Sequence, residues 1–170
     1  MTVFEIMAVN HLEELIAEWY EYKGYFVRRN IPVGKREKGG YETELDIVAY
    51  NPSQKHLVHI EASLDADSWA RREKRFRKKF EYGSEFIPKI FAGMELPKEI
   101  DQMAVLLYAS KQNHKMLGGG RLVLVGELLQ EIFSELDGKL LSSAAVPEHL
   151  LIIRSFQFVS EFRDILFDLQ

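Results

Sequence analysis

The sequence predicts an α/β domain in which a central mixed β-sheet is flanked by helices. Three observations predict it: an amphipathic helical pattern at the start, short apolar runs separated by turn residues up to residue 63, and a return to helical periodicity from residue 67. Strands that alternate with helices are typical of this class. We expect one domain over residues 1–170, because no linker divides a chain of this length.

The first half is expected to run helix, three strands, helix. Asn10 is a suitable N-cap for the first helix, and Gly24 follows it as a C-terminal glycine would. The glycine-rich segment 33–40 predicts a flexible loop, and Gly83 marks the end of the second helix. The expected elements are helix 10–23, strand 25–30, loop 33–40, strand 42–50, strand 56–63 and helix 67–82.

The second half is expected to complete the sheet and its covering layer. Short apolar runs bounded by breakers predict buried strands, and the last apolar segment predicts a terminal helix with Pro147 in its first turn. This last helix is interpreted as part of the core, with a homodimer surface as the alternative. The expected elements are a short extended segment in 85–93, strands 103–110 and 121–126, and helices 127–136 and 147–169.

Composition excludes several classes of protein. The chain has no cysteine, which rules out disulfides, thiolate metal sites and a cysteine nucleophile. No stretch approaches the roughly 18 apolar residues of a membrane span, and the N-terminus does not resemble a signal peptide. We therefore expect a cytoplasmic protein with no membrane partner.

The charge of the chain is unevenly distributed. The net charge is −4, yet residues 71–79 hold seven basic residues and one acidic residue. A concentrated basic segment in an acidic protein is a candidate anion-binding face. The alternative is an ordinary solvated helix surface.

Two carboxylates lie inside the predicted second and third strands. If Tyr50 pairs with Leu57 in an antiparallel hairpin, residues 45, 47 and 49 face residues 62, 60 and 58 on one apolar side. Asp46 then lies directly opposite Glu61, about 5 Å away at Cβ. Two carboxylates this close repel each other unless a cation is shared, and hard divalent ions prefer oxygen ligands. The alternative is an amphipathic hairpin whose polar side faces water.

These segments together resemble the core of the PD-(D/E)XK nuclease superfamily. The matching pieces are Gly24-Tyr25-Phe26-Val27, then Glu44-Leu45-Asp46-Ile47-Val48-Ala49, then Ile60-Glu61-Ala62-Ser63. The chain is most similar to the branch of Mrr-type restriction enzymes and Holliday-junction resolvases. The resemblance implies a restriction endonuclease-like core with the order α-β-β-β-α-β. The motif-bearing part is about 11–82, and 83–170 would complete the α/β domain.

The resemblance also implies a metal site. Asp46 and Glu61 would be ligands of Mg²⁺ or Mn²⁺, and the backbone carbonyl of Ala62 would add an oxygen. Glu13 matches the carboxylate of the family's opening helix, with Glu14 as a rival that the sequence does not separate from it. The implied activity is that of a divalent-metal-dependent endonuclease that hydrolyses phosphodiester bonds of DNA, or of RNA.

The chain departs from the family at Ser63, where a lysine is expected. Three explanations stay open: a basic residue of the following helix takes that place, a second metal ion compensates, or catalysis is lost. The nearest candidates for the first are Arg72, Lys74 and Arg75, with Arg71 also within range. The phosphate backbone dominates nucleic-acid affinity, and the cations expected to contact it are Arg71, Arg72, Lys74, Arg75, Lys78, Lys79, Lys35, Arg36 and Lys38.

The sequence therefore leaves three functions open. The first is a magnesium-dependent deoxyribonuclease. The second is a nuclease-fold protein that has lost catalysis and binds nucleic acid or regulates a partner. The third is a structural, dimer-forming domain whose carboxylates merely face solvent.

Overall fold

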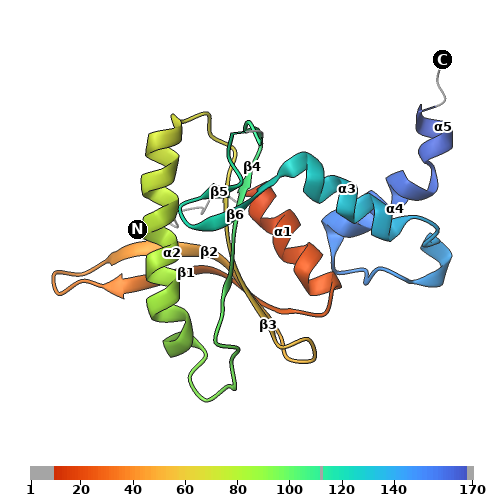
Figure 1. Cartoon of the computed structure of the whole chain (residues 1–170). Coiled ribbons are helices and arrows are strands. Elements are labelled where there is room, and N and C mark those ends of the chain that lie inside the picture. The colour runs from red at the N-terminus through yellow and green to blue at the C-terminus, as the bar shows by residue number, and fades with distance from the viewer. Residues whose placement is uncertain (1–9, 112, 168–170) are drawn as a thin grey trace, which may run out of the picture.

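A computed structural model describes residues 10–111 and 113–167 as one six-stranded sheet with helices on both sides (Figure 1). The strand order is β1-β2-β3-β4-β6-β5. β2 is antiparallel to β1 and β3, whereas β3, β4 and β6 are parallel to one another and β5 is antiparallel to β6. The elements are α1 (His11–Tyr22), β1 (Phe26–Lys35), β2 (Tyr41–Asn51), β3 (His56–Ser63), α2 (Trp69–Ile90), β4 (Asp101–Leu106), β5 (Met116–Leu117), β6 (Gly120–Leu124), α3 (Val125–Leu136), the 3₁₀ turn η1 (Leu141–Ser143), α4 (Leu151–Glu161) and α5 (Arg163–Phe167).

The two faces of the sheet are covered by different helices. One face packs against α1, α3 and α4, whose apolar residues share one core cluster with Ile47, Ala49, Val58 and Ile60. The other face packs against α2, which contributes Ile87 to a second apolar cluster and Phe76 and Phe80 to a third. The predicted α/β class and mixed sheet are confirmed. No helix among the described residues is long and apolar enough to cross a membrane.

Several predicted boundaries were wrong. β1 continues to Lys35, so only 36–40 remain of the expected loop. α2 passes through Gly83 and ends at Ile90, so much of the segment predicted to be extended is helical. The predicted terminal helix is two helices, α4 and α5, and Pro147 precedes them; residues 168 and 169 of that prediction lie outside the described residues.

The predicted register of β2 and β3 is confirmed in its regular part. The ladder runs from Ile47, paired with Ile60, to Asn51, paired with His56. Alternation of apolar residues sufficed to predict it, since a slip of one residue would turn every side chain to the other face.

The alternation fails at one place, which lies beside Asp46. Asn30 of β1 has a positive φ of 51° and falls between the pairs Arg29–Ile47 and Ile31–Leu45. Leu45 then packs in the cluster on the α2 side of the sheet, although we expected it on the same face as Ile47. An isolated left-handed residue in a strand breaks the regular pleat, so the two strands change their inward faces at this level.

Candidate active site

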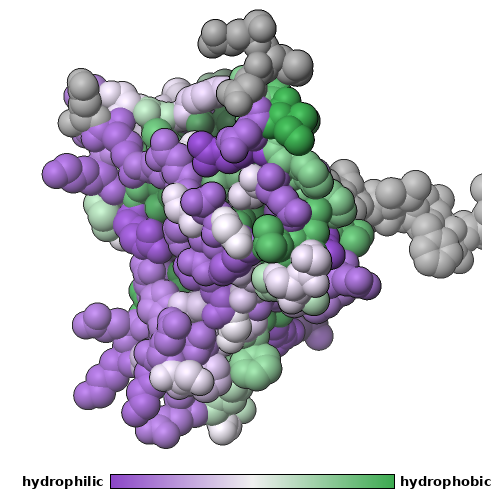
Figure 2. Space-filling view, turned by 90° about the vertical axis from the view of Figure 1, so that its right-hand side faces the viewer, coloured by the Kyte–Doolittle hydropathy of each residue, from purple (hydrophilic) through white to green (hydrophobic). Residues whose placement is uncertain are grey.

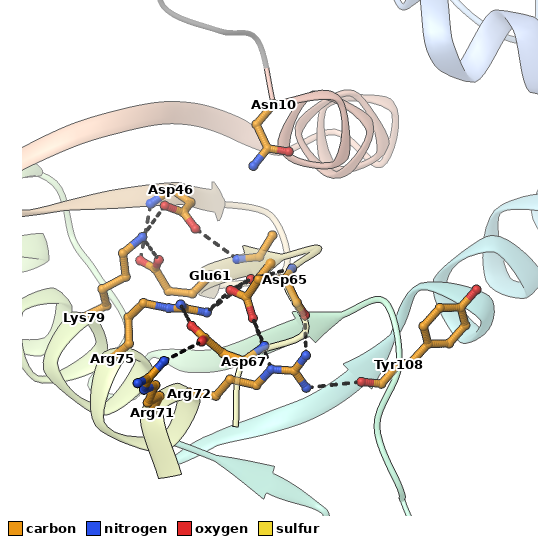
Figure 3. A network of polar contacts seen from close by, with 12 residues as sticks. Asn10, Asp46, Glu61, Asp65, Asp67, Arg71, Arg72, Arg75, Lys79 and Tyr108 are labelled. Atoms are coloured by element: carbon orange, nitrogen blue, oxygen red, sulfur yellow. Dashed lines mark hydrogen bonds and ion pairs between the residues drawn. The ribbon is translucent and has the colours of Figure 1, made fainter. Parts of the chain in front are cut away.

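A buried cluster joins the two strand carboxylates to a lysine of α2. The ammonium group of Lys79 contacts Asp46 Oδ1 and Glu61 Oε2 (Figure 3). Asp46 is 6% exposed and Glu61 only 1%. We call these three residues the central cluster. The alternative of a hairpin whose carboxylates face solvent is therefore wrong.

Backbone hydrogen bonds fix the orientation of both carboxylates. The amide of Ala62 donates to Asp46 Oδ2 at 3.0 Å, and the amide of Asp46 donates to Glu61 Oε1 at 3.3 Å. Side-chain oxygens thus accept backbone donors just beyond the last regular pair of the ladder. Each carboxylate holds one oxygen against the opposite strand and turns the other towards Lys79.

Because both carboxylates are buried, their ionised forms depend on nearby positive charge for stabilisation. Burial and the negative charge of Glu61 raise the pKa of Asp46 to about 7, although Lys79 acts in the opposite sense. Burial also raises the pKa of Glu61. For Lys79, the attraction of the two carboxylates outweighs the effect of burial, so its pKa is raised. The cluster is stabilised by a cation and destabilised by any loss of it.

His59 forms a hydrogen bond with the side chain of Glu61. Its ring is fully buried, and burial lowers its pKa to about 3, so the imidazole is neutral. Nε2 lies 2.7 Å from Glu61 Oε1, to which it donates as the neutral tautomer protonated there. A Cβ at Gly83 would lie 2.2 Å from His59 Nδ1, so α2 can cross at this depth only with glycine at that position. The sequence predicted that the helix ends at Gly83. In the structure the helix continues, and the missing side chain of Gly83 leaves room for the buried ring of His59.

Glu13 and Glu14 have different partners. Burial, followed by the charge of Asp46, raises the pKa of Glu13 to about 7, and Asn10 donates a hydrogen bond to it. Glu14 instead pairs with Arg29 at 3.3 Å. These contacts favour Glu13 for the role that the sequence left open between the two residues.

Ser63 is surrounded by a second polar group at the edge of the site. Its hydroxyl accepts from Arg75 Nη2 at 3.2 Å and donates to Asp65. Arg75 also binds Asp65, and its Nη1 lies 3.1 Å from Asp67. Arg72 adds a contact to Asp65 at 3.3 Å. We call Asp65, Asp67, Arg72 and Arg75 the rim cluster.

The basic candidates for the missing lysine have different partners. Arg72 is nearly buried and donates to the carbonyl oxygens of Asp65 and Tyr108. Lys74 is exposed and makes no salt bridge with any described residue. Lys79, which we had assigned only to phosphate-backbone contacts, is the residue that lies between the strand carboxylates. The sequence analysis missed it because Lys79 lies one helical turn beyond Arg75, the last of the residues considered for that place.

Most of the basic segment is neutralised in three dimensions. Within residues 71–79, every arginine and lysine except Lys74 forms an ion pair with an acidic residue. Lys35 and Lys38 at the hairpin end also make no salt bridge with the described residues. The remaining pairs of the predicted surface are Arg71–Asp67, Arg77–Glu73, Lys78–Glu42 and Arg36–Glu42. The local excess of positive charge in the sequence is therefore largely offset by acids from other segments.

The carboxylate oxygens of Asp46 and Glu61 are of the kind that a hard divalent ion prefers, but they provide only a few protein ligands. Within residues 10–111 and 113–167, no group of three or more histidine, aspartate or glutamate side chains is arranged to hold a metal. What exists is a pair of buried carboxylates, each with one oxygen turned to a common cation. Mg²⁺ accepts such a set, because it commonly uses one or two carboxylates and keeps several waters.

Comparison with known proteins adds no family assignment. No family model matches the chain, and the search of curated proteins finds no significant match. The geometry described above is therefore what bears on function.

Proposed function

We propose that this protein is a divalent-metal-dependent endonuclease that acts on DNA and has a restriction endonuclease-like core. The observation that carries the proposal is the position of Lys79 between Asp46 and Glu61. A lysine from α2 reaches the two strand carboxylates even though Ser63 leaves the strand itself without one. The first explanation for the serine is thereby favoured over the loss of catalysis.

Asp46 and Glu61 would hold Mg²⁺ or Mn²⁺, with the carbonyl of Ala62 as the further oxygen that the family resemblance implies. The ion supplies a more acidic bound water and positive charge beside the phosphate. The hydrogen bonds from the opposite strand and from His59 keep the two carboxylates in place for this task. Such support is what fixes ligands in metal sites generally.

Lys79 would have two roles. Without substrate its ammonium group would offset part of the negative charge of the carboxylate pair. With substrate present, the same group would lie beside the scissile phosphate and stabilise the charge that develops on it. Its four-carbon side chain, 21% exposed, leads from the surface of α2 into the cluster.

Glu13 would assist as a proton carrier. Its pKa of about 7 suits a group that must gain and lose a proton near neutral pH. Asn10 fixes the orientation of its carboxyl group. Glu13 would thus receive a proton from the attacking water or help to order it.

The test is cleavage of supercoiled plasmid in Mg²⁺ or Mn²⁺, with EDTA as the metal-free control. Asp46→Asn and Glu61→Gln keep the shapes of the side chains and remove their charges, and circular dichroism checks that both variants fold. Nicking that is lost in both variants supports the proposal. Nicking that persists in both would attribute the activity to a contaminant or to another site, and would overturn the assignment of these residues.

A second function is favoured by one specific observation. Lys79 contacts one oxygen of each carboxylate. A cluster whose cation is a lysine side chain suits a nucleic-acid-binding or regulatory module without catalysis. Retardation of plasmid on a gel at any metal concentration, with no cutting, would select this function over the nuclease.

A further inference from the structure

An exposed aromatic residue lies beside the rim cluster, at the carboxyl ends of two parallel strands. The last pair of β3 and β4 is Ser63 with Leu106, and the amide of Leu107 still donates to the carbonyl of Ser63 at 3.4 Å. Tyr108 follows directly and is 77% exposed. Leu64, the residue after Ser63, is 51% exposed. Two large side chains with apolar surface are therefore exposed where both strands leave the sheet.

The backbone that carries Tyr108 is fixed by the rim cluster. The nearly buried Arg72 donates from Nη1 to the carbonyl of Tyr108 at 3.3 Å, and from Nη2 to the carbonyl of Asp65. One guanidinium group thus joins the segments that follow β3 and β4. Figure 3 shows the ring of Tyr108 turned away from the charged groups of the rim cluster. An exposed ring on a fixed backbone loses little conformational entropy when it packs against a ligand.

The rest of the segment between β4 and β5 is anchored as well. The ring of His114 stacks on Trp69 at the start of α2, with 3.7 Å between the ring centroids. Lys111 pairs with Glu127 of α3 at 2.6 Å. The segment is therefore held to α2 at both Tyr108 and His114, and to α3 at Lys111. Tyr108 is presented by an anchored backbone, as a side chain of a preorganised binding site is.

Exposure alone would not single out Tyr108. Figure 2 shows hydrophobic side chains at several places on one face of the molecule, and scattered ones are normal on protein surfaces. What distinguishes Tyr108 is its distance from the central cluster. Ser63 lies two residues beyond Glu61 on β3, or roughly 7 Å along the strand, and Leu107, which contacts Ser63, directly precedes Tyr108. A nucleic-acid strand with a phosphate at the central cluster would therefore pass Tyr108 within a few nucleotides.

We propose that Tyr108 is a stacking platform for an unpaired base of the DNA strand that is cut at the central cluster. The inference rests on the proposed nuclease function and names its substrate class, which is DNA with unpaired nucleotides beside the scissile phosphate. In a continuous duplex, neighbouring bases cover both faces of each base, so a tyrosine ring reaches a face only where the strand is unpaired. Every base has such a face, so the stacking selects unpaired strands without reading their sequence.

Binding of fluorescent oligonucleotides to the full chain in EDTA tests the inference without cleavage. Anisotropy compares a single strand with the same strand in a fully paired duplex. Tyr108→Ala should lower the affinity for the single strand about 10-fold and that for the duplex by no more than about 2-fold. Tyr108→Phe keeps the ring and should bind both as the wild type does. Circular dichroism checks that both variants fold.

Phe26→Ala is the matched control for the loss of an exposed ring. Phe26 is 65% exposed, but it pairs with Tyr50, which pairs with Leu57 near the start of β3. It therefore lies at the opposite end of the sheet from Ser63. This variant should leave both affinities unchanged.

Two further readouts distinguish a stacked ring from a structural role of Tyr108. The fold loss caused by Tyr108→Ala should be the same at low and high salt, because stacking releases no counterions, whereas phosphate contacts weaken with salt. Ultraviolet crosslinking of a strand that carries 5-iodouracil should attach it to the peptide that contains Tyr108, as located by mass spectrometry. Crosslinks confined to other peptides would contradict the stacking.

The outcomes separate this inference from the proposed function. If Tyr108→Ala leaves single-strand affinity unchanged in a chain that nicks plasmid, the inference is overturned and the nuclease stands. An equal loss for single strand and duplex overturns the selection of unpaired DNA. A wild-type chain that neither nicks plasmid nor binds either oligonucleotide overturns the inference and the proposed function together.

Discussion

The central cluster and the rim cluster use the same kinds of groups with opposite results. Both join aspartates or glutamates from the strand region to basic residues of α2, and Arg75 and Lys79 lie one helical turn apart. Yet the pKa of Asp46 is raised to about 7, whereas that of Asp65 is lowered to about 2. The geometry of pairing is similar, so another property separates them.

That property is burial. For Asp65, burial is the largest single effect and raises the pKa, but the hydrogen bonds from Ser63, the Asp67 amide and Arg75, with the charge of Arg75, together outweigh it. For Asp46, burial and the nearby Glu61 outweigh Lys79. The half-exposed ion pairs of the rim cluster are stabilised by solvent as well as by their partners. The buried central cluster has two anions and one cation, so it remains short of positive charge. Only the central cluster is thereby prepared to bind a further cation.

The largest expected effect separates the lysines of α2. Lys79→Ala should lower plasmid cleavage by at least about 100-fold, because it removes the one cation placed against the two carboxylates. Lys74→Ala, on the exposed side of the same helix, should change it by no more than a few-fold. Initial nicking rates in Mg²⁺ measure both. Equal rates for the two variants would show that the central cluster has no special role.

Next in size is the cost of crowding His59. Gly83→Ala should lower the free energy of unfolding by about 3 kcal/mol, since its Cβ would lie 2.2 Å from the imidazole and the helix backbone must shift. Gly126→Ala in α3 is the matched control, because a Cβ there meets nothing within 4 Å, and it should stabilise by about 0.5–1 kcal/mol. Urea unfolding measures both.

A second substitution shows whether the imidazole is the cause. Adding His59→Ala to Gly83→Ala should restore part of the lost free energy, because the small side chain vacates the space that the new Cβ needs. If the double variant is no more stable than Gly83→Ala, the contact with His59 is not what requires glycine.

Removing one charge from each cluster should have opposite effects on stability. At pH 8 without metal, Asp46→Asn should raise the free energy of unfolding by about 1–3 kcal/mol, because it ends the repulsion with Glu61 and still accepts from Ala62. Asp65→Asn should lower it by about 1 kcal/mol or less, since its pairs are partly screened by solvent. Changes of the same sign would remove the distinction between the clusters.

The last expected effect is a dependence on pH. A carboxyl group whose pKa is raised on folding contributes stability below its unfolded pKa of about 4, and this contribution is lost as pH rises through about 7. The wild type should therefore lose stability relative to Asp46→Asn between pH 4 and pH 7. Asp65, whose pKa is lowered, should lose its contribution below pH 4. Thermal melting of the three proteins across this range measures both trends.

Local patterns were enough to predict the first helix and the register of β2 and β3. The cap at Asn10 and the apolar alternation of β2 and β3 depend on neighbours in sequence, and both appear as expected. The carboxylate pair followed from that register. Glu13 could not be separated from Glu14, because adjacent helical residues differ only in which way each faces, and α1 needs its tertiary packing to decide that.

The role of Lys79 depends on how a helix crosses a sheet. Its position in the basic segment carries no local sign of its partners, which come from strands 18 and 33 residues earlier. Gly83 and Pro88 concealed the length of α2, since both residues usually end helices. Because α2 continues to Ile90, Lys79 lies in the middle of the helix. It is on the same side as Phe76, Phe80 and Gly83, which all face the sheet.

The change of face at Asn30 has a consequence for protein engineering. The outer part of the β1–β2 hairpin begins a new pleat there, and its apolar residues pack against α2 rather than continuing the pattern of the inner part. The tip at residues 36–40, with its two glycines, lies on the far side of that break from the central cluster. It is thus a suitable position at which to insert a peptide or exchange a loop while the residues around Asp46 keep their arrangement.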